Sequence, residues 1–355
     1  MKSFFSIIAM ALLLTACSKS GTTPPPAPQP TIPASDTSLQ KMLPFKFGAA
    51  VNVNLLQNNA KYSGVVKHEF NSLTAENVMK FSRLHPSENS YTWNEADYLV
   101  SFAQLNNKRV HGHTLIWHNS LPTWVSNFSG DSTAWENLMK THIQTVVAHF
   151  KGKVSSWDVV NEAFNDDGTL RNSIWRQKLG DDYIARCFQY AAAADPDALL
   201  FYNDYGHEYS AVKRTAITNY LTGLKARGIP VHGIGMQFHT RYTQTDANIA
   251  AAITAAATTG LKVHISELDV ALNPDNIQAW MYTSTLATQQ AAKYKFIVKT
   301  FNAIPAAQQY GITTWNVGDA DSWIPGEYSR PDWPLPFDAN YNRKAAYYGI
   351  IDGVK

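Results

Sequence analysis

Residues 262–269 read Lys-Val-His-Ile-Ser-Glu-Leu-Asp, a short apolar and β-branched run that ends in carboxylates. The length and composition of this run predict a buried β-strand. An isolated buried charge is costly, so packing alone does not explain a carboxylate at the end of a core strand. The position of Glu267 therefore points to a functional site at the end of this strand.

Seven further runs of this kind recur along the chain, which gives eight predicted strands. They are Phe45–Asn52, Phe70–Asn77, Arg109–Trp117, Ser156–Ala163, Ala198–Tyr205, Gly233–His239, Lys262–Asp269 and Gly311–Val317. Apolar residues at helical spacing lie between the runs, as in residues 138–150, which follow a predicted capping box at residues 133–136. Strands that alternate with helices are expected to pair in parallel, because a parallel pair needs a long crossover.

The predicted fold class is α/β, a single (β/α)8 TIM barrel over residues 39–355. Eight strand–helix units without an internal linker favour this barrel over two domains. Periodicity alone leaves a doubly wound parallel sheet open as the alternative. In a barrel the carboxyl ends of all strands meet at one mouth, where active sites of this fold lie. The residues expected at that mouth include Asn77, Trp117, Glu162, Tyr205, His239, Glu267 and Trp315.

The composition excludes several classes of protein. The 355 residues carry 30 Lys+Arg and 28 Asp+Glu, so no large positive field points to nucleic acid as a partner. A content of 45% hydrophobic and 16% charged residues argues against a disordered chain. The 2 cysteines, Cys17 and Cys187, cannot form a disulfide scaffold. Cys187 lies in an apolar helical pattern, so we expect it to be a small buried side chain.

The N-terminal segment predicts export. Lys2 precedes an apolar run over residues 4–14, which has the length of a secretory signal and is too short to span a bilayer. Residues 14–17, Leu-Thr-Ala-Cys, resemble a bacterial lipobox, which implies a signal peptide over residues 1–16 and acylation of Cys17. The alternative is an ordinary signal peptide with a chance cysteine at its end.

Residues 17–38 are rich in Pro, Ser and Thr, which predicts a semi-rigid linker between the anchor and the barrel. A lipid anchor followed by a linker tethers a protein to a membrane without spanning it. We therefore expect an exported protein that is lipid-anchored to a bacterial membrane. The outer membrane is favoured, on either its periplasmic or its cell-surface face.

Seven ordered motifs resemble those of glycoside hydrolase family 10, the xylanase family. They are Thr74-Ala-Glu76-Asn77-Val-Met-Lys80, Gly112-His113-Thr-Leu-Ile-Trp117-His118, Trp157 to Glu162, Asn203-Asp204-Tyr205, Gly235-Met-Gln237-Phe-His239, Ser266-Glu267-Leu-Asp269, and Trp315 with Trp323. The resemblance implies endo-hydrolysis of β-1,4-xylosidic bonds in xylan by a retaining double displacement. In that mechanism one carboxyl protonates the leaving oxygen and the other attacks the anomeric carbon, with the two about 5–5.5 Å apart.

By this resemblance Glu162 is the general acid/base and Glu267 is the nucleophile. Glu162 has to carry a proton at the start of the reaction, whereas Glu267 has to stay ionised. His239 and Asp269 each share a strand face with the functional residue two positions away. We infer an Asp269–His239–Glu267 relay that orients the nucleophile and keeps it charged.

The resemblance also implies which residues hold the substrate. Asn161 is expected to bond the sugar 2-hydroxyl, while Trp315 and Trp323 form the floor and wall of the cleft. Trp323 is expected to crowd the space that the CH2OH group of glucose needs. The predicted substrate-binding residues are Glu76, Asn77, Lys80, His113, Trp117, Asn161, Gln237, His239, Trp315 and Trp323. We expect xylan or xylo-oligosaccharide as the partner, no nucleic acid, no metal, no cofactor and a monomeric enzyme.

Two histidines and three departures from the family pattern bear on the site. His111 and His113 alternate on one predicted strand face, but no carboxylate partner is apparent, which disfavours a metal site. Ser120 stands where relatives commonly have Gln, Asn316 where Gly is usual, and Phe81 where Trp is common. We expect Ser120 to change one hydrogen bond to the substrate and Asn316 to change the loop that leads to Trp323.

Two other functions stay open. One is a β-1,4-glucanase or mannanase on the same barrel, which the predicted Trp323 wall disfavours. The other is a non-catalytic surface polysaccharide-binding protein, which the intact pair of Glu162 and Glu267 disfavours.

Overall fold

The computed structural model describes residues 37–355. The predicted signal peptide, Cys17 and nearly all of the predicted linker lie outside the described residues. Within residues 37–355, no helix combines the length and the apolar character needed to cross a membrane.

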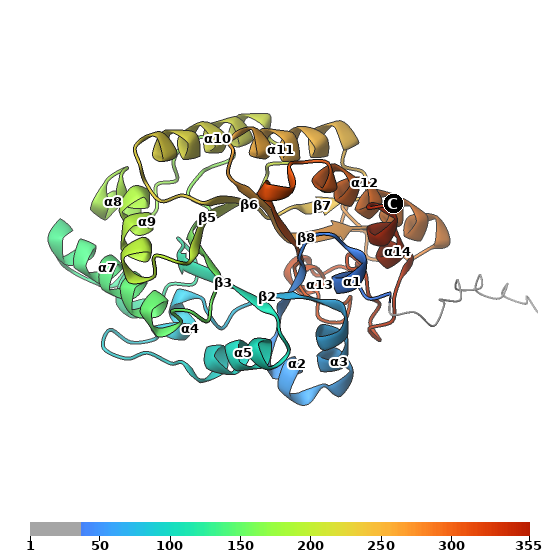
Figure 1. Cartoon of the computed structure of the whole chain (residues 1–355), viewed down its shortest axis with the longest axis horizontal. Coiled ribbons are helices and arrows are strands. Elements are labelled where there is room, and N and C mark those ends of the chain that lie inside the picture. The colour runs from blue at the N-terminus through green and yellow to red at the C-terminus, as the bar shows by residue number, and fades with distance from the viewer. Residues whose placement is uncertain (1–36) are drawn as a thin grey trace, which may run out of the picture. The chain divides into compact units, whose positions relative to one another are not determined.

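Parallel strands form a closed barrel, which confirms the predicted (β/α)8 fold (Figure 1). The strands are β1 (Phe47–Val51), β2 (Ser72–Ala75), β3 (Arg109–Ile116), β4 (Ser156–Asn161), β5 (Leu199–Asp204), β6 (Gly233–Met236), β7 (His239–Arg241), β8 (Lys262–Ala271) and β9 (Gln309–Thr314). Strands β1 to β6 pair in chain order, β6 pairs with β8, and β9 pairs with both β8 and β1. The short strand β7 continues β6 after an interruption at residues 237–238 and pairs with the second half of β8.

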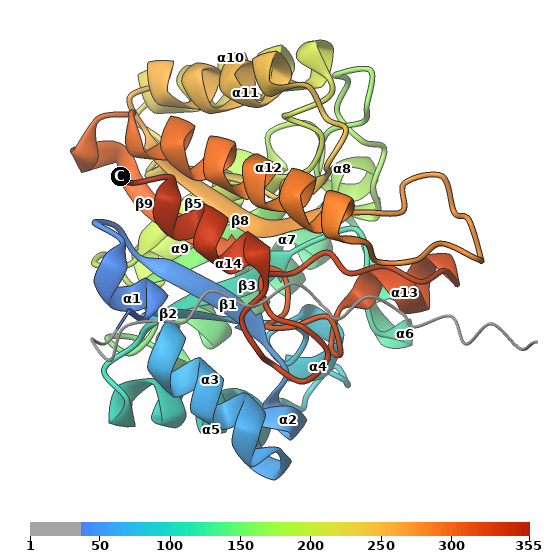
Figure 2. The same ribbon diagram turned by 90° about the vertical axis from the view of Figure 1, so that its right-hand side faces the viewer.

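Helices surround the barrel (Figure 1). They are α1 (Leu39–Met42), α2 (Val53–Asn58), α3 (Ala60–Glu69), α4 (Phe81–Leu84), α5 (Asn94–Leu105), α6 (Thr123–Ser126), α7 (Ser132–His149), α8 (Ile174–Leu179), α9 (Tyr183–Ala194), α10 (Ala211–Ala226), α11 (Asp246–Thr258), α12 (Ser284–Asn302), the 3-10 helix η1 (Ala306–Gln308), α13 (Trp323–Tyr328) and α14 (Ala345–Asp352). Figure 2 shows α1 and the C-terminus at one end of the barrel, and α6 and α13 at the other.

Local sequence explains most of these elements. The predicted apolar face of α7 is buried through Leu138, Met139 and Ile143. The predicted capping box at residues 133–136 is wrong, because Asp131 caps α7 by accepting a hydrogen bond from the backbone of Ala134 at 2.9 Å. Cys187 is fully buried within α9, as its apolar surroundings predicted.

Glycines on the strands leave room for large aromatic side chains of neighbouring strands. A Cβ atom on Gly112 in β3 would lie 2.1 Å from the ring of Trp157, and one on Gly233 in β6 would lie 2.0 Å from Phe201. Large aromatic side chains therefore fill space that only glycine leaves open.

The strand register is irregular where the functional residues lie. The pairing of β3 with β4 shifts between His113 and Ile116, and the pairing of β8 with β9 shifts between Ile265 and Leu268. Such bulges redirect side chains at barrel rims and beside active sites. Glu267 falls within the second of these irregularities.

Candidate active site

A cleft of about 690 Å3 opens at the carboxyl ends of the strands. It brings together Glu162, Glu267 and every predicted substrate-binding residue: Glu76, Asn77, Lys80, His113, Trp117, Asn161, Gln237, His239, Trp315 and Trp323. Asp269 lines an adjoining cavity of about 330 Å3, which shares His239 and Trp323 with the main cleft. The fold thus collects residues from seven of the strand ends in one concave surface.

Glu162 follows β4 with its backbone held in a left-handed conformation at φ 56°. Non-glycine residues rarely adopt this conformation, so neighbouring groups have to hold it in place. Its N–H donates to the carbonyl of Asn203 at 2.9 Å, and its own carbonyl accepts from Nε of Arg171 at 2.9 Å. The bend directs the carboxylate into the cleft, where Nε1 of Trp117 and Nε2 of Gln237 each donate to it at 2.9 Å.

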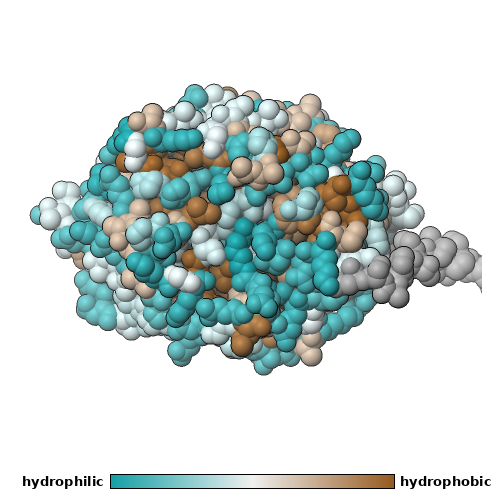
Figure 3. Space-filling view, viewed as in Figure 1, coloured by the Kyte–Doolittle hydropathy of each residue, from teal (hydrophilic) through white to brown (hydrophobic). Residues whose placement is uncertain are grey.

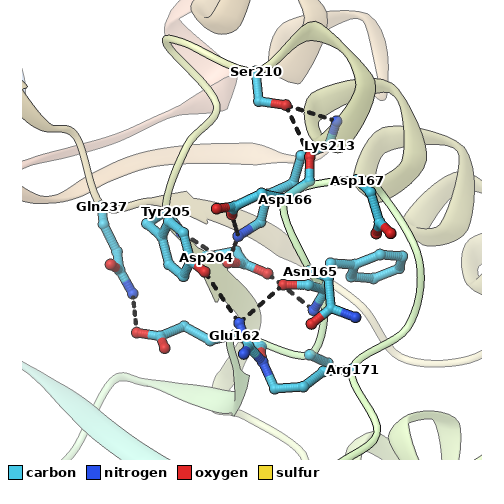
Figure 4. A network of polar contacts seen from close by, with 12 residues as sticks. Glu162, Asn165, Asp166, Asp167, Arg171, Asp204, Tyr205, Ser210, Lys213 and Gln237 are labelled. Atoms are coloured by element: carbon cyan, nitrogen blue, oxygen red, sulfur yellow. Dashed lines mark hydrogen bonds and ion pairs between the residues drawn. The ribbon is translucent and has the colours of Figure 1, made fainter.

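A buried cation lies behind this residue (Figure 4). Lys213 of α10 is completely buried and lies 2.9 Å from a carboxylate oxygen of Asp204 and over the ring of Tyr205, 3.1 Å from its centre. The hydroxyl of Tyr205 accepts a hydrogen bond from Arg171 at 3.1 Å. The loop that carries Glu162 is therefore supported from β5 and α10. Arg171 and Lys213 were not predicted as site residues, because each acts from a loop or a helix and not from a strand end.

Glu267 has a different environment from Glu162. It is 5% exposed and accepts hydrogen bonds from Nδ2 of Asn203 at 2.7 Å and from Nε2 of His239 at 3.1 Å. Burial opposes ionisation, but the His239 bond, the nearby His113 and the Asn203 amide together hold the pKa of Glu267 below its usual value. This carboxylate is therefore kept in the charged form.

His239 lies between two carboxylates. Its Nδ1 contacts Oδ2 of Asp269 at 2.7 Å and its Nε2 contacts Oε2 of Glu267 at 3.1 Å, so both ring nitrogens act as donors. Burial disfavours a charged ring, yet Asp269 and Glu267 raise the pKa of His239 well above its usual value. Asp269 also accepts from Nε1 of Trp323 at 2.9 Å. The predicted Asp269–His239–Glu267 contact is thus present, and it also fixes the indole of Trp323.

A pair of amides connects the two glutamates. Nδ2 of Asn203 donates both to Glu267 and to Oδ1 of Asn161, at 2.7 and 2.9 Å. Nδ2 of Asn161 in turn lies 3.2 Å from Glu162. Oδ1 of Asn203 accepts from Ser266, and a Cβ atom on Gly235 would lie only 2.4 Å from that oxygen. Asn203 belongs to one of the family-10 motifs, but the sequence did not predict that it joins the two glutamates. Its position near the end of a predicted strand could have identified it as a site residue.

The expectation that His111 and His113 have no carboxylate partner is wrong. His111 and His113 do have a carboxylate partner, Asp158, which lies 3.0 Å from Nε2 of His111 and 2.9 Å from Nδ1 of His113. Burial acts to raise the pKa of Asp158, but the two histidines hold it well below its usual range. The strand pairing places His113 beside Asp158, a register that sequence does not reveal. Among residues 37–355, no group of His, Cys, Asp and Glu is arranged to hold a metal ion.

An aromatic and cationic wall faces the two glutamates. Nζ of Lys80 lies 5.4 Å from the ring centre of Trp117 and 5.7 Å from that of Trp315, and it donates to Asn77 at 2.8 Å. Burial lowers the pKa of Lys80, although Glu267, Glu76 and Glu162 act in the opposite direction. Trp315 is 7% exposed and packs edge-on against His113. These side chains suit a neutral, hydroxyl-rich ligand, because a sugar ring can stack on the indoles and its hydroxyl oxygens can accept hydrogen bonds from Lys80.

A family model described as Glycosyl hydrolase family 10 matches residues 36–353. The chain belongs to this family. Its sequence is 40% identical over 321 residues to Endo-1,4-beta-xylanase from Geobacillus stearothermophilus, with 87% of this chain and 95% of that protein covered. The structure of xylanase 10B from Thermotoga petrophila RKU-1 in complex with xylobiose shares 36% identity and a TM-score of 0.84, covering 89% of this chain and 97% of that one.

Other family-10 relatives are much longer. Exoglucanase XynX from Acetivibrio thermocellus is 38% identical over 325 residues, which cover 88% of this chain but 29% of that protein. The chain therefore spans less than a third of the length of this relative.

The departures from the family-10 pattern have visible consequences. Asn316 has φ 82°, a conformation that suits glycine and that asparagine also tolerates. Its side chain accepts the backbone N–H of Trp323 at 3.2 Å, so the substitution adds a contact at the start of α13. Ser120 also has a positive φ, 53°, and its carbonyl accepts from Ser82. Phe81 stacks on His142 in the core, which agrees with a packing role.

Several cleft residues of this family-10 chain were not predicted as ligand contacts. They are Asn119, Tyr205, Tyr209, Glu327 and Tyr328. Tyr209, Glu327 and Tyr328 are exposed and lie in loops or at the edge of α13, where the sequence carries no strand-end signal.

We predict that Asp269→Asn moves the alkaline limb of the pH profile of kcat/KM to lower pH. Asp269 contributes strongly to the raised pKa of His239, so a neutral amide lets His239 lose its proton at a lower pH. The unprotonated Nε2 then presents a lone pair to Glu267 instead of a donor. Measuring kcat/KM against pH on a xylo-oligosaccharide provides the check.

The matched control is Glu327→Gln, which removes an exposed carboxylate from the same cleft. It should leave the alkaline limb in place. An Asp269→Asn variant with lower activity but an unchanged alkaline limb contradicts the assignment of the His239 charge to Asp269.

Proposed function

We propose that this chain is a retaining endo-1,4-β-xylanase that hydrolyses xylan. The observation that carries the proposal is the pair of glutamates with contrasting environments, joined through Asn161 and Asn203 in one open cleft. Glu267 is kept ionised by donors that surround it, as a nucleophile requires. Glu162 directly follows β4, and its carboxylate points into the cleft and accepts hydrogen bonds from Trp117 and Gln237.

In the first step, Glu162 gives its proton to the glycosidic oxygen while Glu267 attacks the anomeric carbon. The bond to the leaving oxygen breaks, and the departing chain carries away a new hydroxyl. The product is a glycosyl ester on Glu267, and the negative charge has moved from Glu267 to Glu162. With Glu267 neutral, the ionised form of Glu162 is no longer opposed by a neighbouring carboxylate, which prepares it for the second step.

In the second step, the Glu162 carboxylate takes a proton from water as the water oxygen attacks the anomeric carbon. The ester bond to Glu267 breaks and the electron pair returns to its carboxylate. His239 then stabilises the regenerated anion through its Nε2 hydrogen bond. Two inversions at the anomeric carbon give a product with the original β configuration.

Xylose is the sugar that the geometry favours. Trp323 is fixed by Asp269 through its Nε1 and by Asn316 through its backbone, so its indole is a rigid wall beside His239. A pyranose that lacks the CH2OH group fits against such a wall more easily than glucose or mannose. The xylobiose complex of the Thermotoga petrophila relative agrees with this choice.

A β-1,4-glucanase is the second candidate, because one relative at 38% identity is named an exoglucanase. Reducing ends released from linear and branched xylan, β-1,4-glucan and mannan distinguish these possibilities. Xylan should be the preferred substrate, with a range of oligosaccharides as early products. Binding of xylan without release, or faster release from glucan, contradicts the proposal.

We predict that Glu162→Ala reduces hydrolysis of xylan far more than hydrolysis of aryl xylosides with good leaving groups. Xylan needs a protonated leaving oxygen, and removing a general acid costs about 10²–10⁴-fold in rate, whereas a good leaving group needs little protonation. Steady-state kinetics on both substrates provide the measurement. Equal losses on the two substrates argue against Glu162 as the acid.

We also propose that the mature enzyme is an exported lipoprotein anchored through Cys17 and acts as a monomer. The support is the order of a basic residue, an apolar run and Leu-Thr-Ala-Cys at residues 14–17, followed by a proline-rich segment. Cells given a labelled fatty acid should incorporate the label into the wild-type protein and not into Cys17→Ala. Absence of label from the wild-type protein, or equal labelling of the two proteins, contradicts acylation at Cys17.

A further inference from the structure

Basic side chains gather at the end of the barrel opposite the cleft, where each helix leads into the next strand. They come from the segments that lead into β1, β2, β3, β4, β6 and β8, including the first residues of β3 and β8: Lys41, Lys46, Lys67, Lys108, Arg109, Lys151, Lys153, Lys225, Arg227 and Lys262. We call this set the basic end. Its members are scattered over more than 200 residues of sequence, and the fold brings them to one face.

Contacts between the turns confirm that this is one surface. Lys46, Arg109 and Lys262 line a single cavity of about 530 Å3, together with uncharged residues. Burial and the neighbouring Lys46 lower the pKa of Lys108 to about 8. Nζ of Lys108 also donates to the backbone carbonyl of Lys67. The positive charges are therefore close enough to act together on an approaching anion.

Carboxylates offset only part of the charge of this end within residues 37–355. Those near it are Glu69, Asp182, Asp195, Asp197 and Asp352, and Asp182 forms an ion pair with Arg227 at 2.7 Å. Glu69 and Asp195 are buried, at 4% and 2% exposure, and Glu69 is paired with Arg343. Asp352 pairs with Lys355. The small net charge of the whole chain is therefore unevenly distributed. Basic residues gather at one end of the barrel, and the mouth at the other end contains Glu76, Glu162, Glu267 and Asp269.

Exposed apolar side chains lie at the same end. Leu105, the last residue of α5, is 84% exposed, and Met42, the last residue of α1, is 36% exposed. Figure 3 shows the face that carries α1 and the C-terminus, with hydrophilic residues over much of it and small apolar patches between them. Lysines interspersed with exposed aliphatic residues are typical of surfaces that rest on lipid headgroups.

We propose that the basic end docks on anionic lipid headgroups of the membrane in which the protein is anchored. The proposal rests on the lipid anchor proposed above, because a tether makes weak electrostatic contacts effective by raising the local concentration. Helix α1, the first described element after the tether, lies at this end (Figure 2). Docking in this orientation turns the cleft away from the membrane and toward a polysaccharide in solution.

Co-sedimentation with vesicles tests this surface separately from the anchor. The chain from Ser18 onward lacks both the signal and Cys17, and it contains the barrel that corresponds to 97% of the solved Thermotoga petrophila chain. It should bind vesicles of phosphatidylcholine containing phosphatidylglycerol, and bind those of phosphatidylcholine alone far more weakly. Binding should weaken as salt rises, since the Debye length falls to about 8 Å at physiological ionic strength.

The decisive comparison uses two triple variants of equal net charge. Lys46→Gln, Lys151→Gln and Lys153→Gln remove exposed charges from the basic end, and should weaken binding to the anionic vesicles by about tenfold or more. The control, Lys61→Gln, Lys140→Gln and Lys178→Gln, removes exposed charges from α3, α7 and α8, and should weaken it much less. Both variants should keep the wild-type kcat on xylo-oligosaccharides, which reports correct folding.

Three outcomes overturn the proposal: no binding to anionic vesicles, equal binding to neutral vesicles, or equal weakening by the two triple variants. None of them bears on catalysis. Absence of xylan hydrolysis, conversely, refutes the proposed activity and leaves the vesicle result intact.

Discussion

The rest of the site depends on His239, which contacts Asp269 through one ring nitrogen and Glu267 through the other. Two buried carboxylates a few residues apart on β8 repel each other, and an imidazolium that donates to both offsets this cost. The break between β6 and β7 places His239 opposite Asp269 in the strand pairing, so the ring reaches both carboxylates. Because Asp269 also accepts a hydrogen bond from Trp323, the group that holds His239 beside Glu267 also positions the indole of Trp323.

The second glutamate is arranged relative to this fixed group. Asn203 holds Glu267 on one side and Asn161 on the other, so the position of Glu162 follows from the position of Glu267. Arg171 and the neighbouring Asn203 carbonyl maintain the left-handed backbone at Glu162. Strands and buried hydrogen bonds thus determine the geometry, and loops contribute the outer part of the cleft.

Short-range patterns in the sequence predicted the strands and the residues at their ends, whereas the resemblance to family 10 implied the roles of these residues. Apolar runs predicted the strands, and motifs such as residues 157–162 predicted where side chains enter the cleft. Partners across strands were not predictable, since register depends on tertiary packing. The missing acceptor for His111 and His113 was Asp158, only one strand away. The basic end was missed for a related reason, because tertiary packing brings its residues together. The cap of α7 was missed for a local reason, because Asp131, Ser132 and Thr133 are adjacent residues that can each cap a helix, and Asp131 does so.

The central claim is that Glu267 attacks the sugar and forms a covalent intermediate. The most direct measurement is mass spectrometry of the enzyme after incubation with a 2-deoxy-2-fluoro xylobioside that carries a good leaving group. We expect a stable adduct of one fluorinated xylobiosyl unit, located by peptide mapping on Glu267. An adduct on another carboxylate, or turnover of the reagent with release of the inverted α product, contradicts the claim.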